Sequence, residues 1–186
     1  MTKQKVTVCL SAFLFGPAYL LYRKMWKEGL LTALLSIVLS VPSLIAIVAT
    51  FNPSLAYRYA EAVGEECRAG GIEVLLGPGM NIYRNSQNGR NFEYMGEDPY
   101  LASIMVVPYI QGLQSKGVSA CVKHYCLNNE EEYRHQVNVI VSDRALHEIY
   151  LPAFKAAVEK GKTWGIMGAY NLYKNEHNCH NQWTLN

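Results

Sequence analysis

Residues 117–124 read GVSACVKH: a glycine, an uncharged run of five residues, and then a lysine beside a histidine. The run predicts a strand over residues 118–124, because it is short, apolar and preceded by a turn residue. A charged pair that ends an apolar strand either reaches solvent or lines a site. Position alone leaves both interpretations open for Lys123 and His124.

The pattern repeats on both sides of this strand. The predicted elements are a helix over 57–71, a strand over 72–79, a helix over 97–117, the strand over 118–124, a strand over 137–142, a helix over 143–161 and a strand over 164–171. Glycines close two of the helices, and Ser142 or Asp143 is the expected N-cap of the last one. Strands that alternate with helices are typical of parallel α/β units, so the sequence predicts an α/β fold.

Polar residues follow the predicted strands: residues 81–90, then Lys123 and His124, then Tyr170 and Asn171. In barrels and open sheets of parallel strands, sites are built at the carboxyl ends of the strands. Purely structural roles for these residues remain open at this point. Arg90 could be a loop residue paired with a nearby carboxylate, and Tyr170 could simply pack in the core.

Composition and motifs exclude several other classes of function. The net charge of +2 and the lack of a long basic run give no case for nucleic-acid binding. The five cysteines include no CxxC pair, and His124 and His135 lie eleven residues apart, so no metal site is predicted. Gly77-Pro78-Gly79 is not followed by a phosphate-binding motif, so no nucleotide cofactor is expected.

The first 50 residues differ from the rest of the chain. Residues 6–22 and 30–51 carry no charge, and the second run, as a helix, would be about 33 Å long, enough to cross a bilayer core. A buried helix of a soluble core is the alternative. We expect residues 1–50 to form transmembrane-like hydrophobic helices and residues 51–186 to form the α/β part.

Basic residues predict the orientation of such a segment. Five basic residues precede the second hydrophobic run: Lys3, Lys5, Arg23, Lys24 and Lys27. Within about twenty residues after the run there are two, Arg58 and Arg68. The positive-inside rule therefore places the α/β part outside the cytoplasm, with the protein attached to a membrane.

Four segments carry a resemblance when they are taken in order. They are LLGPGMNIYRNSQNGRNFEYMGEDPYLA (75–102), GVSACVKHYCLNNEEEYRH (117–135), VSDRALHEIYLPAFKAAV (141–158) and WGIMGAYN (164–171). Together they resemble the amino-terminal barrel of glycoside hydrolase family 3, which includes β-glucosidases and β-xylosidases. The similarity runs from about residue 49 to the end of the chain. It implies part of a (β/α)8 TIM-type barrel and a β-glucoside or β-xyloside substrate.

The resemblance also implies roles for individual residues. The family residues that line the subsite for the non-reducing sugar fall here on Arg90, Lys123, His124, Arg134 and Tyr170. Charged donors suit the hydroxyls of a sugar ring. Glu130, Glu131 and Glu132 are then expected to be solvated loop residues.

No catalytic residue is assigned within the 186 residues. A retaining glycosidase uses two carboxyl groups about 5 Å apart. In the family, the nucleophile is an aspartate of a later SDW-type motif and the acid/base is a glutamate of a later domain. The SD pair here, Ser142-Asp143, belongs to an earlier motif and is expected to cap a helix. The chain is therefore expected to be a fragment of a β-glycosidase. The alternative is a small membrane protein with a decayed, non-catalytic sugar-binding or structural appendage.

Overall fold

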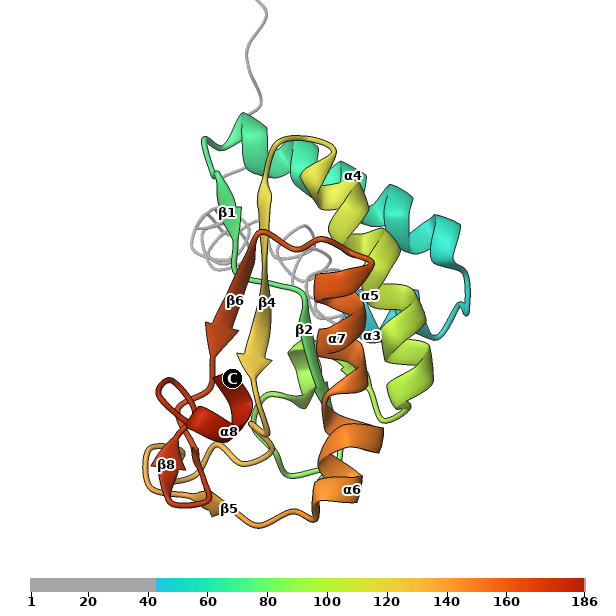
Figure 1. Cartoon of the computed structure of the whole chain (residues 1–186). Coiled ribbons are helices and arrows are strands. Elements are labelled where there is room, and N and C mark those ends of the chain that lie inside the picture. The colour runs from blue at the N-terminus through green and yellow to red at the C-terminus, as the bar shows by residue number, and fades with distance from the viewer. Residues whose placement is uncertain (1–42, 186) are drawn as a thin grey trace, which may run out of the picture. The chain divides into compact units, whose positions relative to one another are not determined.

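The computed structural model describes residues 43–185, and within them one parallel sheet organises the fold (Figure 1). Its strands are β1 (Val74–Leu75), β2 (Gly79–Ile82), β3 (Tyr94–Gly96), β4 (Ser119–Tyr125) and β6 (Gly165–Gly168). β4 is central: β1 and β2 pair with it on one side, at Ser119 and Lys123, and β6 pairs with it on the other. β2, β4 and β6 therefore lie side by side in chain order.

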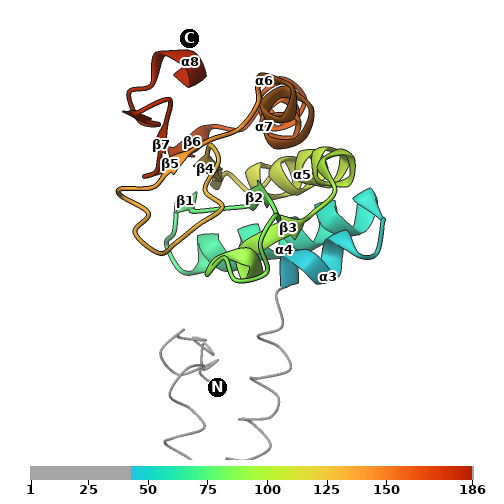
Figure 2. The same cartoon turned by 90° about the horizontal axis from the view of Figure 1, so that it is seen from below.

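Helices cover one face of this sheet. They are α4 (Pro53–Ala69), α5 (Pro99–Gln114) and α7 (Pro152–Glu159), which lie in an arc along the sheet in Figure 2. The short helix α3 (Ser43–Val48) precedes them. α5 connects β3 to β4 and α7 precedes β6, so the chain alternates strand and helix as parallel units require.

Local sequence signals explain where the helices begin and how closely they pack. Asp98 accepts hydrogen bonds from the backbone N–H groups of Tyr100 and Leu101, at 2.8 and 2.9 Å, and so caps α5. α4 and α5 approach so closely that a Cβ at Gly112 would overlap the carbonyl of Tyr57. Glycine at this position therefore sets the distance between the two helices.

Parts of the chain after β4 form a second, smaller sheet. β5 (Asn138–Val139), β7 (Leu172–Tyr173) and β8 (Glu176–His177) make a three-stranded sheet, and α8 (Gln182–Leu185) follows it. In the chain between β5 and β6, α6 (Asp143–Ala145) continues through a π-helical turn (Leu146–Tyr150) into α7. The hydroxyl of Ser142 accepts from the N–H of Ala145 at 3.2 Å, which confirms the predicted cap.

Two strand predictions were wrong in detail. The strand predicted over 72–79 divides in two: β1 covers Val74–Leu75, with Val74 exposed, and the buried strand β2 begins at Gly79 and continues past the predicted end. The strand expected over 137–142 shrinks to β5, which lies in the small sheet, and Ile140 is 93% exposed. Apolar character did not predict which segment is buried. Gly79 is buried because β3 packs closely against it, and Asn81 because it hydrogen-bonds to the backbone of His124.

The hydrophobic run 6–22 and residues 30–42 of the second run lie outside the described residues. Residues 43–185 contain no helix with the length and apolar character needed to cross a membrane. Of the described residues of the second run, Ser43–Val48 form the six-residue helix α3, and a turn follows.

Candidate functional site

Five charged side chains of alternating sign meet at the carboxyl ends of β2 and β4. They are, in spatial order, Lys123, Glu93, Arg90, Glu131 and Arg134, and are called the charge ladder below. Successive members lie 2.7 Å (Nζ to Oε2), 3.1 Å (Oε1 to Nη1), 3.1 Å (Nε to Oε1) and 2.9 Å (Oε2 to Nη1) apart.

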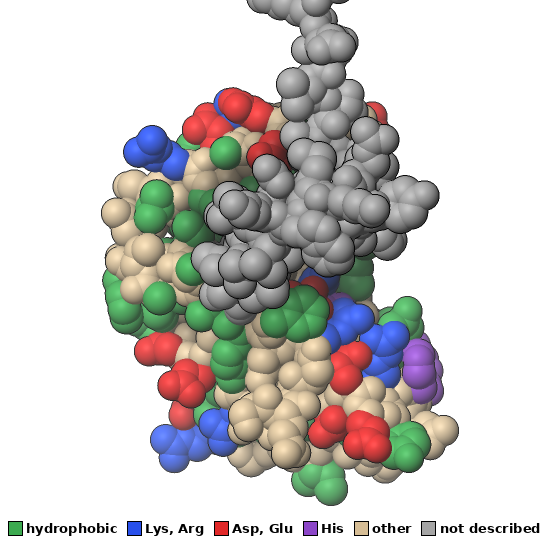
Figure 3. Space-filling model, turned by 180° about the vertical axis from the view of Figure 1, so that it is seen from behind, with side chains coloured by type: hydrophobic (Ala, Val, Ile, Leu, Met, Phe, Trp, Pro, Cys, Tyr) green, Lys and Arg blue, Asp and Glu red, His purple; other side chains and the backbone are tan. Residues whose placement is uncertain are grey.

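The ladder is partly shielded from water. Its side chains are between 14% and 30% exposed, so its ion pairs are stronger than fully solvated ones. Lys123 comes from β4, Arg90 and Glu93 from the segment between β2 and β3, and Glu131 and Arg134 from the loop after β4. Figure 3 shows basic and acidic side chains gathered with a histidine on one face of the described part of the chain.

His124 lies under the ladder and is 5% exposed. Its Nε2 is 2.6 Å from Nη1 of Arg90, and its Nδ1 is 3.0 Å from the hydroxyl of Tyr94. Burial, with help from the charges of Arg90 and Lys123, lowers the pKa of His124 to about 4. The ring is therefore neutral at pH 7. Since a guanidinium only donates, Nε2 accepts from Arg90 and Nδ1 carries the proton.

The backbone and neighbours of His124 are fixed as well. The side-chain amide of Asn81, in β2, accepts from the N–H of His124 at 2.6 Å and donates to its carbonyl at 2.9 Å. The amide of Asn128 donates to the hydroxyl of Tyr94 and to Glu131, both at 2.9 Å. Tyr94 is completely buried, and burial raises the pKa of its hydroxyl. These contacts join the ladder to the sheet beneath it.

Tyr170 packs against Arg134, the last member of the ladder. It follows β6, is 52% exposed, and lies with its ring centroid 4.9 Å from Cζ of Arg134 and 4.6 Å from the ring of His135. The guanidinium of Arg134 is thus held by a carboxylate and by an aromatic face.

All five predicted site residues are brought together: Arg90, Lys123, His124, Arg134 and Tyr170. The expectation for Glu131 was wrong, since this side chain is 20% exposed and bonded to both arginines. The expected pairing of Arg90 with a nearby carboxylate is seen with Glu93. Sequence reasoning missed Asn81, Tyr94 and Asn128 as supporting residues. The pairs Arg90/Glu93 and Glu131/Arg134, each three residues apart, were the signal available for the carboxylates.

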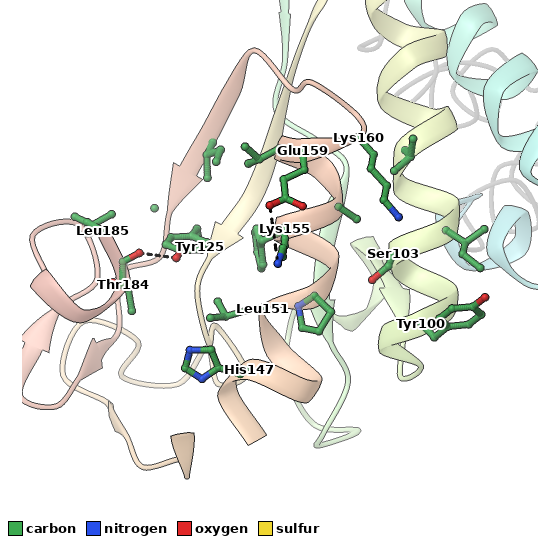
Figure 4. A pocket seen from close by; sticks show the side chains of 18 of the residues that line it. Tyr100, Ser103, Tyr125, His147, Leu151, Lys155, Glu159, Lys160, Thr184 and Leu185 are labelled. Carbon is green, nitrogen blue, oxygen red and sulfur yellow. Dashed lines mark hydrogen bonds and ion pairs between the residues drawn. The ribbon is translucent and has the colours of Figure 1, made fainter. Parts of the chain in front are cut away.

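A cavity of about 1230 Å³, with no ladder residue in its lining, lies between α5, α7 and α8 (Figure 4). Its lining is largely apolar, and its polar contacts are few. The hydroxyl of Tyr125 donates to the carbonyl of Thr184 at 2.5 Å, and Lys155 lies 3.9 Å from Glu159. This cavity lacks the convergent charged groups of the ladder, so the ladder is the stronger candidate for binding a polar molecule.

Comparisons with known proteins show that this chain is similar to glycosidases. The chain is 62% identical over 141 residues to a β-glucosidase of Bacteroides ovatus, covering 76% of this chain and 19% of the relative. It is 44% identical over 144 residues to an exo-α-(1→6)-L-arabinopyranosidase of Bifidobacterium breve, covering 77% and 19%. The chain thus spans about a fifth of the length of these curated relatives.

Solved structures agree with the sequence comparison. β-Glucosidase 3B of Thermotoga neapolitana in complex with glucose aligns with a TM-score of 0.75 and 47% identity, covering 78% of this chain and 20% of that one. The α/β fold is therefore that of the barrel domain in these enzymes. The motifs of the sequence resemble the family from about residue 49, whereas the profile of the glycosyl hydrolase family 3 N-terminal domain matches residues 20–185. The chain belongs to glycosyl hydrolase family 3.

Proposed function

We propose that this chain carries the recognition site for the terminal sugar of a β-glucosidase-type glycoside hydrolase. The observation that supports the proposal most is the charge ladder together with His124, which place three cations and one neutral histidine at the carboxyl ends of parallel strands. Strand ends are where barrel enzymes build their sites.

The donors of the ladder suit the hydroxyls of a pyranose. Lys123 has three N–H donors, of which Glu93 takes one, and Arg90 and Arg134 each keep donors beyond those shared with the carboxylates. Hydrogen bonds from charged donors are stronger than neutral ones. A site that pairs each hydroxyl also rejects analogues that lack one, because its own polar groups are then left unpaired.

The ladder carboxylates serve recognition and not bond cleavage. Glu93 and Glu131 each contact two cations, and, against the effect of burial, the pKa of the Glu131 carboxyl is held below its ordinary value by the Asn128 amide and by Arg90 and Arg134. A retaining glycosidase needs one carboxyl group that donates a proton to the leaving oxygen. We assign neither the nucleophile nor the acid/base to residues of this chain.

The proposed substrate is a β-glucoside or a β-xyloside. The name of the Bacteroides ovatus relative and the glucose bound in the Thermotoga neapolitana structure favour glucose. The Bifidobacterium breve relative is named for a pentopyranose, which has no hydroxymethyl group. The ladder therefore supports the recognition of ring hydroxyls, which glucose and xylose share.

Titration of the 186-residue chain with D-glucose tests the proposal. We expect saturable NMR shifts of the Arg90 and Arg134 side chains and of the His124 ring, and a much weaker effect of sorbitol, an open-chain polyol. Equal shifts with both compounds, or shifts confined to the cavity between α5 and α7, would count against the proposed site.

A further inference from the structure

Glu131 uses both of its carboxylate oxygens to connect two arginines from different loops. Oε1 lies 3.1 Å from Nε of Arg90 and accepts from the Asn128 amide at 2.9 Å, while Oε2 accepts from Nη1 of Arg134 at 2.9 Å. Arg90 is in the segment after β2, and Arg134 is in the loop after β4. Among the described residues, this carboxylate is the ion-pair partner that the two arginines share.

The two arginines depend on Glu131 to different degrees. Arg90 also contacts Glu93 at 3.1 Å and His124 at 2.6 Å, so three partners fix its guanidinium. Arg134 has Glu131 as its hydrogen-bonded side-chain partner within residues 43–185, together with the face of Tyr170. A long side chain with one such partner loses its preferred orientation when that partner is removed.

We propose that Glu131 is a positioning residue, which holds Arg134 against Tyr170 and fixes its spacing from Arg90, so that both guanidiniums present donors to one sugar ring. The sugar-binding part of this inference rests on the proposed function, whereas the orientation of Arg134 does not. When the donors are already ordered before the sugar binds, less side-chain conformational entropy is lost on binding.

The surroundings of Glu131 agree with positioning and not with proton donation. Burial by itself would raise the pKa of the Glu131 carboxyl, but the Asn128 amide and the charges of Arg90 and Arg134 outweigh it and hold the pKa below its ordinary value. A general acid needs a raised pKa. Glu131 is ionised at neutral pH and acts through the residues that it contacts.

The test uses the 186-residue chain and compares Glu131→Gln with Glu132→Gln. Glu132 is adjacent and exposed, and the change in charge is the same, which makes it a matched control. The first measurement is the rate of rotation about the Cζ–Nε bond of Arg134, followed by NMR. The second is the affinity for D-glucose. Unchanged backbone amide shifts of β4 and β6 show that each variant keeps the fold.

In Glu131→Gln, we expect the rotation of Arg134 to accelerate about fivefold or more and the glucose affinity to fall roughly tenfold, because a charge-assisted bond is lost. Glu132→Gln should leave both within about twofold of the parent chain, as is usual for an exposed side chain outside the network. If Glu131→Gln does not fold, Glu131→Asp gives the same comparison, because the shorter side chain cannot reach both arginines.

The outcomes separate this inference from the proposed function. Unchanged Arg134 rotation in Glu131→Gln would overturn the inference whether or not glucose binds. Faster rotation with unchanged glucose affinity would overturn the link between Glu131 and the sugar. If the parent chain binds no glucose, the proposed function fails for this chain. The rotation rates then still decide whether Glu131 fixes Arg134.

Discussion

Nη1 of Arg90 lies 2.6 Å from Nε2 of His124, so the guanidinium donates and the imidazole accepts. The contact requires a neutral ring, because a protonated imidazole would place two cations in contact. The protonation state of His124 therefore controls whether the centre of the charge ladder can form as observed.

The first prediction concerns stability in acid. The pKa of His124 is lowered to about 4 from an ordinary value of 6.5, so the unfolded chain binds the extra proton more readily than the folded one. The free energy of unfolding is therefore highest above about pH 6.5. It decreases as the pH falls toward 4, by up to about 3 kcal/mol. Urea unfolding between pH 7 and pH 4 measures this loss.

The matched comparison is His124→Gln with His147→Gln, the latter an exposed position in the π-helical turn. His124→Gln should lower stability at pH 7 and flatten the decline between pH 6.5 and 4. His147→Gln should keep the decline of the parent chain. A decline that is equally steep in all three chains would show that His124 does not carry it.

The second prediction concerns Lys123, whose ammonium group lies 2.7 Å from Glu93. Lys123→Met keeps most of the stem volume but removes the charge and three donors. Hydrogen bonds to charged groups are worth about 1.5–3 kcal/mol, so the affinity for D-glucose should fall roughly tenfold or more. Calorimetry or NMR titration measures it. The control, Lys155→Met on α7, alters an exposed lysine away from the ladder and should bind as the parent does.

The third prediction concerns the packing of α4 on α5. Gly112→Ala introduces a Cβ that would overlap the Tyr57 carbonyl, so the helices must move apart. Overpacking of this kind costs about 1–3 kcal/mol of unfolding free energy. Gly70→Ala, at the end of α4, meets its nearest neighbour at 3.4 Å and should change stability far less. Equal stability of the two variants in urea unfolding would contradict the close approach of the helices.

The fourth prediction concerns catalysis. The 186-residue polypeptide should not hydrolyse aryl β-glucosides or β-xylosides, because Glu93 and Glu131 are engaged by cations and we assign no residue of the chain as a proton donor. Release of the aryl group is measured by absorbance. Turnover that is abolished by Glu93→Gln or Glu131→Gln would show that a ladder carboxylate takes part in the chemistry.

The fifth prediction concerns the amino-terminal segment. The uncharged run 30–51 ends in the short helix α3, where Val48 is buried in the core. We therefore predict that the uncharged residues before α3 attach the protein to a membrane, with the α/β part outside the cytoplasm. The protein should resist extraction by carbonate, and protease should reach the α/β part in right-side-out vesicles. Recovery in the carbonate supernatant would refute attachment, whereas protection from protease would refute only the orientation.

The order of the main elements could be predicted from the sequence. β4 could be predicted because a short apolar run that follows a glycine is typical of a strand, and α4 and α5 because their apolar residues and caps are local signals. The position of Lys123 and His124 alone left open whether they line a site or reach solvent, and the family resemblance assigned them to the site. Arg90, Arg134 and Tyr170 were identified through family resemblance, and no local rule distinguished them from ordinary loop residues.

The pairing of the charges could not be predicted from the sequence and is seen in the folded chain. Glu131 stands between two other glutamates in a polar loop, and its sequence neighbourhood is that of a solvated residue. Its role depends on Arg90, which reaches it from a different loop, and on partial burial, which strengthens their interaction. The same holds for β2, whose Gly79 and Asn81 are buried by the close approach of β3 and by hydrogen bonds to His124. Contacts between residues far apart in the chain leave no periodic pattern in the sequence. These contacts are therefore visible in the folded structure and could not be predicted from the local sequence.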